Sequence, residues 1–226
     1  MANTKSISVN KYLHRGQEML RNATTIKSPT DLFYRIYWKS HPIIHWNQVV
    51  MDQSTEKMVR ALPYRNFSVL EISGNKWKDF GFKNYETLKY PEFDICNNEL
   101  GLGDKKYDLI IAEQVFEHLL WPYRAGKNVF KLLKPGGYFL NTLPFLIVIH
   151  KCPVDCSRWT ETGLKYFLAE CGFPVEHTET DAWGNRQFLK AHAKNGVVPF
   201  YIKHIHSLKN EPKYPASIWS LSRKPE

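Results

Sequence analysis

The apolar residues of this chain follow one spacing up to about residue 62 and a different one beyond it. Residues 9–23 and 29–62 carry apolar side chains three and four positions apart, a spacing that gathers them on one face of a helix. Pro42 and Pro63 interrupt the pattern, and proline ends or kinks a helix. The pattern therefore predicts two or three N-terminal helices.

After these helices, short runs of β-branched and aromatic residues alternate with helical stretches. The runs predicted as strands are FSVLEIS (67–73), YETLKY (85–90), YDLIIAE (107–113), GYFLNTLP (137–144) and ASIWSLS (216–222). Residues 122–133 and 160–172 are predicted helices, the second with Thr160 as its N-cap and Gly172 as its stop. This alternation predicts an α/β fold with a mostly parallel sheet covered on both faces. Residues 182–213 have weak periodicity and are expected to form an insertion or a rim loop.

The first predicted strand ends in a turn that could approach a ligand. Sheets of this kind bind ligands at the carboxyl ends of their strands, beside the first strand-to-helix turn. Here the strand is followed by Ser73 and Gly74. A glycine has no Cβ, so the backbone of Gly74 can come close to a ligand and its N–H can face a carboxylate. Because dinucleotide-binding loops carry two or three glycines, the stretch alone also fits an ordinary strand end.

The chain is basic, with 31 Lys and Arg against 22 Asp and Glu, and the excess lies in residues 1–60 and 182–226. Basic flanks can meet nucleic acid, an acidic membrane surface or a phosphorylated substrate. The basic residues are scattered rather than gathered in a long run. We therefore expect a solvated basic surface, with nucleic-acid binding as the alternative.

Neither a membrane-spanning segment nor a secretory signal is predicted. The longest apolar piece, FLIVI at 145–149, is far shorter than the roughly 20 residues of a membrane-spanning helix. The N-terminus lacks the apolar segment of a secretory signal. Cys152 and Cys156 have a C-x3-C spacing, but Cys96 and Cys171 provide no matching second pair for zinc. These features predict reduced cysteines, a cytoplasmic location and no membrane partner.

The strand ends form a recognisable succession when they are taken in chain order. They are VLEISGN (69–75), PEFDIC (91–96), YDLIIAEQVFEHLLWP (107–122), LLKPGGYFLNTLPF (132–145) and RWTETGLKYFLAECGF (158–173). This succession resembles the class I S-adenosylmethionine-dependent methyltransferases, in the branch with a type 11 methyltransferase domain. The resemblance covers about residues 67–180. It implies a doubly wound, seven-stranded Rossmann-like sheet over residues 64–226, with residues 1–63 as a helical cap or lid.

The resemblance also implies residues that bind S-adenosylmethionine. Glu71 would lie near the positively charged amino-acid part of the cofactor, and Asp94 would accept a hydrogen bond from the adenine amino group. Gln114 would lie beside the methionine part. The complete implied set is Glu71, Ser73, Gly74, Glu92, Asp94, Ile95, Glu113 and Gln114.

Two departures from the family pattern affect this set. Ser73 and Asn75 stand where the family commonly has glycines, so the loop is a shortened cofactor turn. The acid that normally holds the ribose is not evident, because Lys89 occupies its place and Glu86 or Glu92 would have to substitute.

The methyl acceptor is expected to meet the polar residues after the fourth and fifth strands of the family pattern. His150 is predicted to be the general base, with His118 as the second candidate, because each follows a strand end and an imidazole can be neutral near pH 7. A structural histidine is the alternative. Asp155 and Arg158 are predicted substrate contacts. Two aromatic residues of the N-terminal helices, Tyr34 and Trp38, are predicted to line the pocket, although core packing is the commoner fate of such residues.

The residues around His118 and His150 could also form a metal site. Some O-methyltransferases of this fold carry E-x-x-E-H and a later histidine that together hold a divalent metal. In this chain Gln114 replaces the first glutamate, which leaves Glu117 as the one anionic ligand beside two histidines. One carboxylate is poor for magnesium, and no metal is predicted.

These residues predict an S-adenosylmethionine-dependent methyltransferase that acts on a hydroxyl or amine of a small molecule, such as a sugar, a nucleotide-linked compound or a secondary metabolite. An RNA methyltransferase is one alternative because of the basic flanks, although no RNA-binding module is recognisable. A catalytically idle cofactor-binding domain is the other, because of the shortened glycine loop. The oligomeric state is not predicted.

Overall fold

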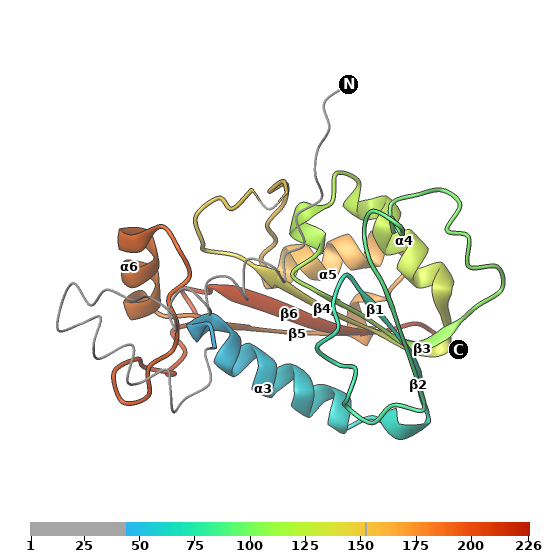
Figure 1. Cartoon of the computed structure of the whole chain (residues 1–226), viewed down its shortest axis with the longest axis horizontal. Helices are drawn as coiled ribbons and strands as arrows, with labels where there is room; N and C mark the ends of the chain where they lie inside the picture. The colour runs from blue at the N-terminus through green and yellow to red at the C-terminus, as the bar shows by residue number, and fades with distance from the viewer. Residues whose placement is uncertain (1–43, 152) are drawn as a thin grey trace, which may run out of the picture. The chain divides into compact units, whose positions relative to one another are not determined.

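The computed structural model describes residues 44–151 and 153–226, and its described elements surround one twisted sheet (Figure 1). The chain divides into two compact units, Met1–His45 and Trp46–Glu226, and every element below belongs to the second. The N-terminal helices expected before residue 44 therefore lie outside the described residues, as do Tyr34 and Trp38.

The sheet has six strands in the order β2-β1-β3-β4-β6-β5. They are β1 (Ser68–Ile72), β2 (Asn84–Leu88), β3 (Tyr107–Glu113), β4 (Leu133–Pro144), β5 (Thr178–Trp183) and β6 (Ser217–Arg223). Strands β1 to β4 pair in parallel, and β6 runs antiparallel to both β4 and β5. The doubly wound, mostly parallel sheet is thus confirmed, as are all five strands predicted from the apolar runs.

The strand count differs from the seven that the resemblance implies. Residues 89–106, between β2 and β3, contain only turns and bends. Among the described residues no strand therefore lies outside β2, and β2 is an edge of the sheet. Strand β5, at the other edge, was not predicted because its sequence TETDAW has no β-branched or aromatic run longer than one residue.

The described helices include those predicted at residues 122–133 and 160–172, which are α4 and α5. The helices are α3 (Trp46–Arg60), α4 (Pro122–Leu132), α5 (Glu161–Glu170) and α6 (Arg186–Asn195), with short 3₁₀ turns η1 (Tyr64–Asn66), η2 (Phe116–His118) and η3 (Val175–His177). The side chain of Thr160 accepts a hydrogen bond from the amide of Gly163 at 3.0 Å, so it caps α5 as expected. Helix α6 lies within residues 182–213, which were expected to form an insertion or a rim loop, so a rim loop is wrong for residues 186–195. Its start is capped by Asn185 and its end by Gly196 in the left-handed conformation.

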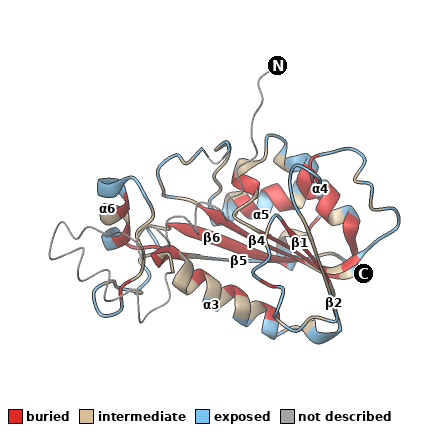
Figure 2. Ribbon diagram, viewed as in Figure 1, coloured by how far each residue is buried: buried red, intermediate tan, exposed pale blue. Residues whose placement is uncertain are grey.

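Alternate residues of each strand supply the two faces of the sheet. Leu70 and Ile72 of β1 pack in one core with side chains of α4 and α5, whereas Val69 packs in a second core with Val59 of α3. Figure 1 shows α4 and α5 on one side of the sheet and α3 on the other, and Figure 2 shows the buried strands between them. Each fully buried large apolar side chain contributes roughly 1.5–3 kcal/mol. The two cores fix the strand ends from both faces.

Helix α3 belongs to the same compact unit as the sheet. Trp46 is fully buried, lies 5.6 Å from the ring of Phe188 and stacks on His206 at 4.0 Å between ring centroids. The second compact unit therefore begins at Trp46 and includes α3.

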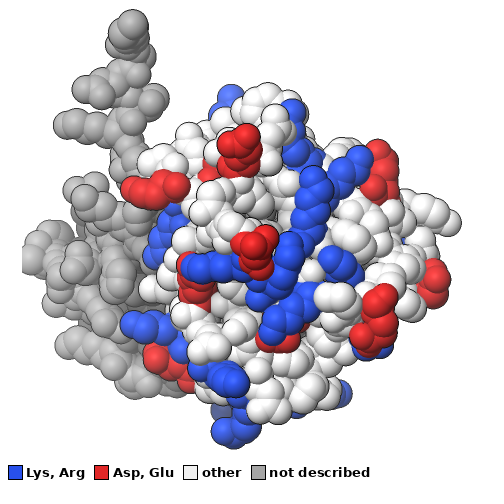
Figure 3. Space-filling view, turned by 90° about the vertical axis from the view of Figure 1, so that its right-hand side faces the viewer, with Lys and Arg blue, Asp and Glu red and all other residues white. Residues whose placement is uncertain are grey.

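The surface of the described residues carries mixed charge. Figure 3 shows Lys and Arg in a band across one face, with Asp and Glu among them. Cys96, Cys156 and Cys171 are free thiols. None of the described helices combines the length and the apolar character that crossing a membrane would require.

Candidate active site

The carboxyl ends of β1, β2, β3 and β4 lie at one edge of the sheet because these strands are parallel. A loop leaves this edge after each of these strands. The amide of Ser73, just after β1, donates to the carbonyl of Leu88 at the end of β2 at 2.8 Å. The amide of Gln114, just after β3, donates to the carbonyl of Thr142 in β4 at 2.9 Å. These bonds hold neighbouring strand ends together where the sequence predicted the cofactor.

Two residues of this edge have a backbone conformation that favours glycine. Ser73 has a φ of 64° and Gln114 a φ of 53°, both in the left-handed region. Such conformations cost on the order of 1–3 kcal/mol each and are concentrated at functional sites. Ser73, which stands where the family commonly has a glycine, thus adopts a left-handed conformation that favours glycine.

The loop after β1 is built on the carboxylate of Glu71, which is 1% exposed. Its Oε1 accepts a hydrogen bond from the amide of Lys76 at 3.1 Å, and its Oε2 accepts from the amide of Trp77 at 3.0 Å and from the hydroxyl of Tyr85 at 2.6 Å. A Cβ on Gly74 would lie 1.9 Å from Oε1. Position 74 therefore requires glycine because the loop passes directly over this carboxylate. Glu71 shapes the loop, and its direct contact with the cofactor stays a prediction.

A charged network crosses the same edge. The ammonium of Lys76 lies 2.8 Å from Asp52 of α3 and 2.9 Å from Glu113 at the end of β3. Burial alone would lower the pKa of Lys76, but the two carboxylates outweigh it and hold that pKa above its usual value. Burial raises the pKa of Glu113, and Lys76 offsets only part of this rise. Sequence patterns did not indicate this network because its members are far apart in the chain.

The segment after β2 reaches the start of α4. Asp94 is half-buried, and its Oδ1 accepts a hydrogen bond from the amide of Cys96 at 2.8 Å. The side-chain amide of Asn128 in α4 donates to the carbonyl of Ile95 at 2.8 Å and to that of Asn97 at 2.8 Å. The side chain of Ile95 is 2% exposed and lies in the core, so the structure leaves only its backbone for a ligand.

The two acids considered for the ribose are placed differently. The carboxylate of Glu86 accepts hydrogen bonds from the hydroxyl of Tyr107 at 2.9 Å and from the ammonium of Lys105 at 3.1 Å. Tyr107 begins β3, so this cluster faces the amino end of the strand and away from the cofactor loop. Glu92 is exposed in the segment after β2 and remains as the predicted ribose contact.

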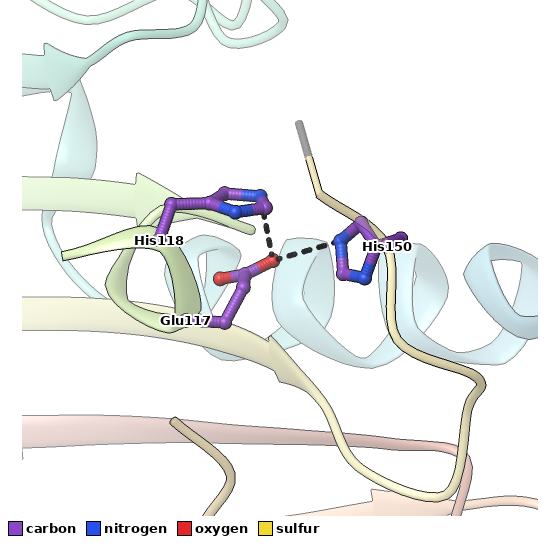
Figure 4. Close-up of side chains that lie close together, drawn as sticks. All are labelled: Glu117, His118 and His150. Carbon is purple, nitrogen blue, oxygen red and sulfur yellow. Dashed lines mark ion pairs between the residues drawn. The ribbon is translucent and has the colours of Figure 1, made fainter. Parts of the chain in front are cut away.

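A buried glutamate lies between two histidines beyond the ends of β3 and β4 (Figure 4). Glu117 and His118 belong to η2, and His150 follows β4. The Nε2 atom of His118 lies 3.5 Å from Oε1 of Glu117, and the Nε2 atom of His150 lies 4.0 Å from the same oxygen. Glu117 is 0% exposed, and neither of its carboxylate oxygens has a hydrogen-bond partner among the described residues. Burial raises the pKa of Glu117 to about 8.

Both imidazoles of this cluster tend toward the neutral form. Burial lowers the pKa of His118. Burial also lowers the pKa of His150, and the neighbouring His118 lowers it further. The Nδ1 of His118 donates to the carbonyl of Val154, which can only accept, so the lone pair of its Nε2 faces Glu117. The two predicted catalytic residues are therefore brought together, with a carboxyl group that the sequence did not mark as buried.

The loop after β4 is fixed around this cluster by Asp155 and Arg158. Asp155 accepts a hydrogen bond from the amide of His150 at 2.8 Å and forms a two-bond pair with the guanidinium of Arg158. Burial would raise the pKa of Asp155, but the hydrogen bonds from Arg158 and His150 hold it below its usual value. The carbonyl of Glu117 accepts from the amide of Cys156 at 2.7 Å, which ties the loop to η2. The charges of Asp155 and Arg158 thus neutralise each other. The expected contacts of these two residues with the substrate stay predictions.

The part of the chain that contains these strand ends is similar in sequence to known proteins. The family described as a methyltransferase domain matches residues 56–141, which include β1, β2, β3, α4 and most of β4. Residues 56–141 are thus similar to the methyltransferase domain of the class I S-adenosylmethionine-dependent methyltransferases. The resemblance of its strand ends is therefore confirmed, and the family implies S-adenosylmethionine as the cofactor of this methyltransferase domain.

The methyltransferase domain has curated relatives and solved neighbours. A protein of Mycolicibacterium smegmatis named "Probable S-adenosylmethionine-dependent methyltransferase" is 31% identical over 99 residues, which are 40% of this chain and 38% of that protein. The "Hybrid PKS-NRPS synthetase traA" of Penicillium crustosum is 27% identical over 100 residues, which are 42% of this chain and 2% of that protein. The chain thus spans less than half the length of the curated relatives that it matches.

The fold of the methyltransferase domain also occurs in a solved structure from Galdieria sulphuraria that its name assigns to a sarcosine dimethylglycine methyltransferase. The two have a TM-score of 0.50 and 13% sequence identity, and the match covers 87% of this chain and 97% of the other. At this identity the likeness concerns the fold alone.

Proposed function

We propose that this protein is an S-adenosylmethionine-dependent methyltransferase that acts on a hydroxyl or amine of a small molecule. The proposal rests chiefly on the cluster of Glu117, His118 and His150, which lies beyond β3 and β4 at the same sheet edge as the Gly74 loop. A proton-accepting group beside a cofactor loop is what methyl transfer to a hydroxyl or a protonated amine requires.

The residues at the edge fit this cofactor. Glu113 already holds the ammonium of Lys76, so the edge offers the type of charge that the ammonium of the cofactor needs. The exposed residue Ser73 leaves the backbone of the loop open to a carboxylate. Asp94 and Glu92 are the proposed partners of adenine and ribose. When bound, S-adenosylmethionine supplies a methyl group carried on a sulfonium.

The chain itself would contribute alignment and proton handling. Holding acceptor and donor in line can lower a barrier by roughly 7–11 kcal/mol. Of the two histidines, His150 is the more open, with 35% of its side chain exposed against 15% for His118. We place the acceptor on this open side, where the Asp155–Arg158 pair fixes the loop.

The proposed function can be tested with a mixture of small hydroxyl and amine compounds. The full-length protein is incubated with S-adenosylmethionine carrying an isotopically labelled methyl group, and mass spectrometry follows labelled products and S-adenosylhomocysteine. Thermal unfolding with the cofactor runs in parallel, since a ligand at 100 times its dissociation constant adds about 2.7 kcal/mol of stability. We expect stabilisation and one labelled compound class. Label that enters only RNA in a parallel incubation with bulk RNA would contradict the small-molecule acceptor, and stabilisation by the cofactor without any labelled product would indicate an idle cofactor-binding domain.

A further inference from the structure

We infer that Glu117, His118 and His150 form a binding site for one divalent transition-metal ion of the zinc class. One ligand atom from each residue lies within 4.8 Å of the others (Figure 4). The site joins two segments, η2 and the loop after β4, whose relative position is fixed by hydrogen bonds from the amides of Cys156 and Ser157 to the carbonyl of Glu117.

The separations suit a common metal ion. Zinc lies about 2.0–2.2 Å from nitrogen and oxygen ligands, so tetrahedral ligands lie roughly 3–4 Å from one another. The Nε2 atoms of His118 and His150 are 3.5 Å and 4.0 Å from Oε1 of Glu117. Small side-chain rotations would therefore bring all three atoms to bonding distance.

Glu117 is the strongest sign that a cation belongs here. Its carboxylate is fully buried, and neither oxygen has a hydrogen-bond partner among the described residues. Buried carboxylates are normally paired, hydrogen-bonded or bound to metal. The nearest guanidinium, that of Arg158, is already bound to both oxygens of Asp155. A metal ion would give Glu117 the partner that the protein groups around it do not supply.

The two histidines are oriented as metal ligands usually are. A ligating histidine commonly uses its second nitrogen to bond a carbonyl or a carboxylate, which fixes the ring. In His118 this is the Nδ1 bond to the carbonyl of Val154. In His150 the Nδ1 atom lies 3.4 Å from Oδ2 of Asp155 and 3.4 Å from Nη2 of Arg158. Both Nε2 atoms are therefore directed toward Glu117.

The donor set selects the class of metal. Magnesium and calcium prefer oxygen ligands, whereas two imidazoles and one carboxylate suit zinc and related transition metals. Three protein ligands leave a coordination position open, which is typical of catalytic sites. If the proposed function holds, the hydroxyl or amine of the acceptor would occupy that position, and the metal ion would promote its deprotonation in place of a free histidine base. The sequence analysis predicted no metal because one carboxylate is poor for magnesium. The burial of Glu117 is evident only from the structure.

Metal binding can be measured without cofactor or acceptor. Full-length protein free of any polyhistidine tag is stripped with a chelator and titrated with zinc by calorimetry, and with cobalt while visible absorption is followed. We expect one saturable site per chain. Because loss of a second-layer partner already lowers metal affinity about 10–100-fold, Glu117→Gln and His150→Ala should each lower it by at least about 100-fold. Zinc should also raise the unfolding temperature of the wild-type chain and leave that of Glu117→Gln unchanged.

The chain contains a matched control, because Glu176 and His177 form a second Glu-His pair that is exposed. Glu176→Gln, His177→Ala and Cys156→Ser should keep wild-type zinc affinity. Zinc binding that survives in Glu117→Gln and His150→Ala, is lost in Cys156→Ser, or is absent in the wild type would overturn the inference. Cofactor titrations on the same samples separate the two proposals. Loss of zinc binding alone rejects the metal site, and absence of cofactor binding alone rejects the proposed methyl transfer.

Discussion

Single carboxylates decide the local structure of the candidate site, and the clearest case is Glu71. Three donors from Lys76, Trp77 and Tyr85 converge on its carboxylate and hold the loop after β1 in place. Its position could be predicted from the sequence as the end of a strand. Its bonding could not, because Tyr85 comes from β2 and reaches Glu71 only through the parallel pairing of the two strands.

Removing the Tyr85 hydroxyl should weaken the folded state. Tyr85→Phe deletes the 2.6 Å bond to Glu71, and a hydrogen bond to a charged group contributes about 1.5–3 kcal/mol. We expect the free energy of unfolding, measured in urea, to fall by about that amount. Tyr166→Phe is the control, since the side chain of Tyr166 is 65% exposed, and it should change stability by less than about 0.5 kcal/mol. Equal effects of the two variants would show that the bond does not organise the loop.

At the scale of secondary-structure elements, the sequence predicts best those strands and helices whose apolar residues are buried. The strands with apolar runs and the helices with a clear cap and stop were predictable, because both signals are local. Strand β5 and helix α6 were missed for the opposite reason. The polar residues of β5 are accommodated at a sheet edge, and α6 is mostly polar and buries only Phe188 and His192. Their places are set by packing on β6 and α3.

Lys76 connects three elements, α3, the loop after β1 and β3, so its removal should have a pH-dependent effect. Lys76→Met leaves Asp52 and Glu113 close together without a cation, which raises the pKa of both carboxyls in the folded state above the unfolded values. A raised carboxyl pKa means that the folded state binds more protons, so stability falls as the pH rises above about 4.

The Lys76→Met variant should therefore lose roughly 1–3 kcal/mol relative to wild type at pH 7.5 and little at pH 4.5, as measured by urea unfolding at both pH values. Lys105→Met removes the more exposed ion pair with Glu86 and provides the control. It should differ from wild type by less than about 0.5 kcal/mol at either pH. A loss of stability in Lys76→Met that does not depend on pH would contradict this role of the network.

At the scale of the whole molecule, the parallel strands bring together residues that are distant in the sequence. The order of strand ends was enough to predict the sheet, and it places the expected cofactor site at the edge where the parallel strands have their carboxyl ends. It could not show that Glu117 is buried, since that depends on the loop after β4 folding over η2. It also suggested an additional strand that residues 89–106 do not form.

The most direct test of the central claim is calorimetric titration of S-adenosylmethionine into the full-length protein and into Gly74→Val. A side chain at position 74 would collide with Glu71, because even a Cβ would lie 1.9 Å from its Oε1. Gly163→Ala, in the first turn of α5, is the control, as its Cβ meets no atom nearer than 3.2 Å. We predict one binding site in the wild type and in Gly163→Ala, and no detectable binding in a folded Gly74→Val. Unchanged affinity in Gly74→Val would contradict the placement of the cofactor at this edge of the sheet.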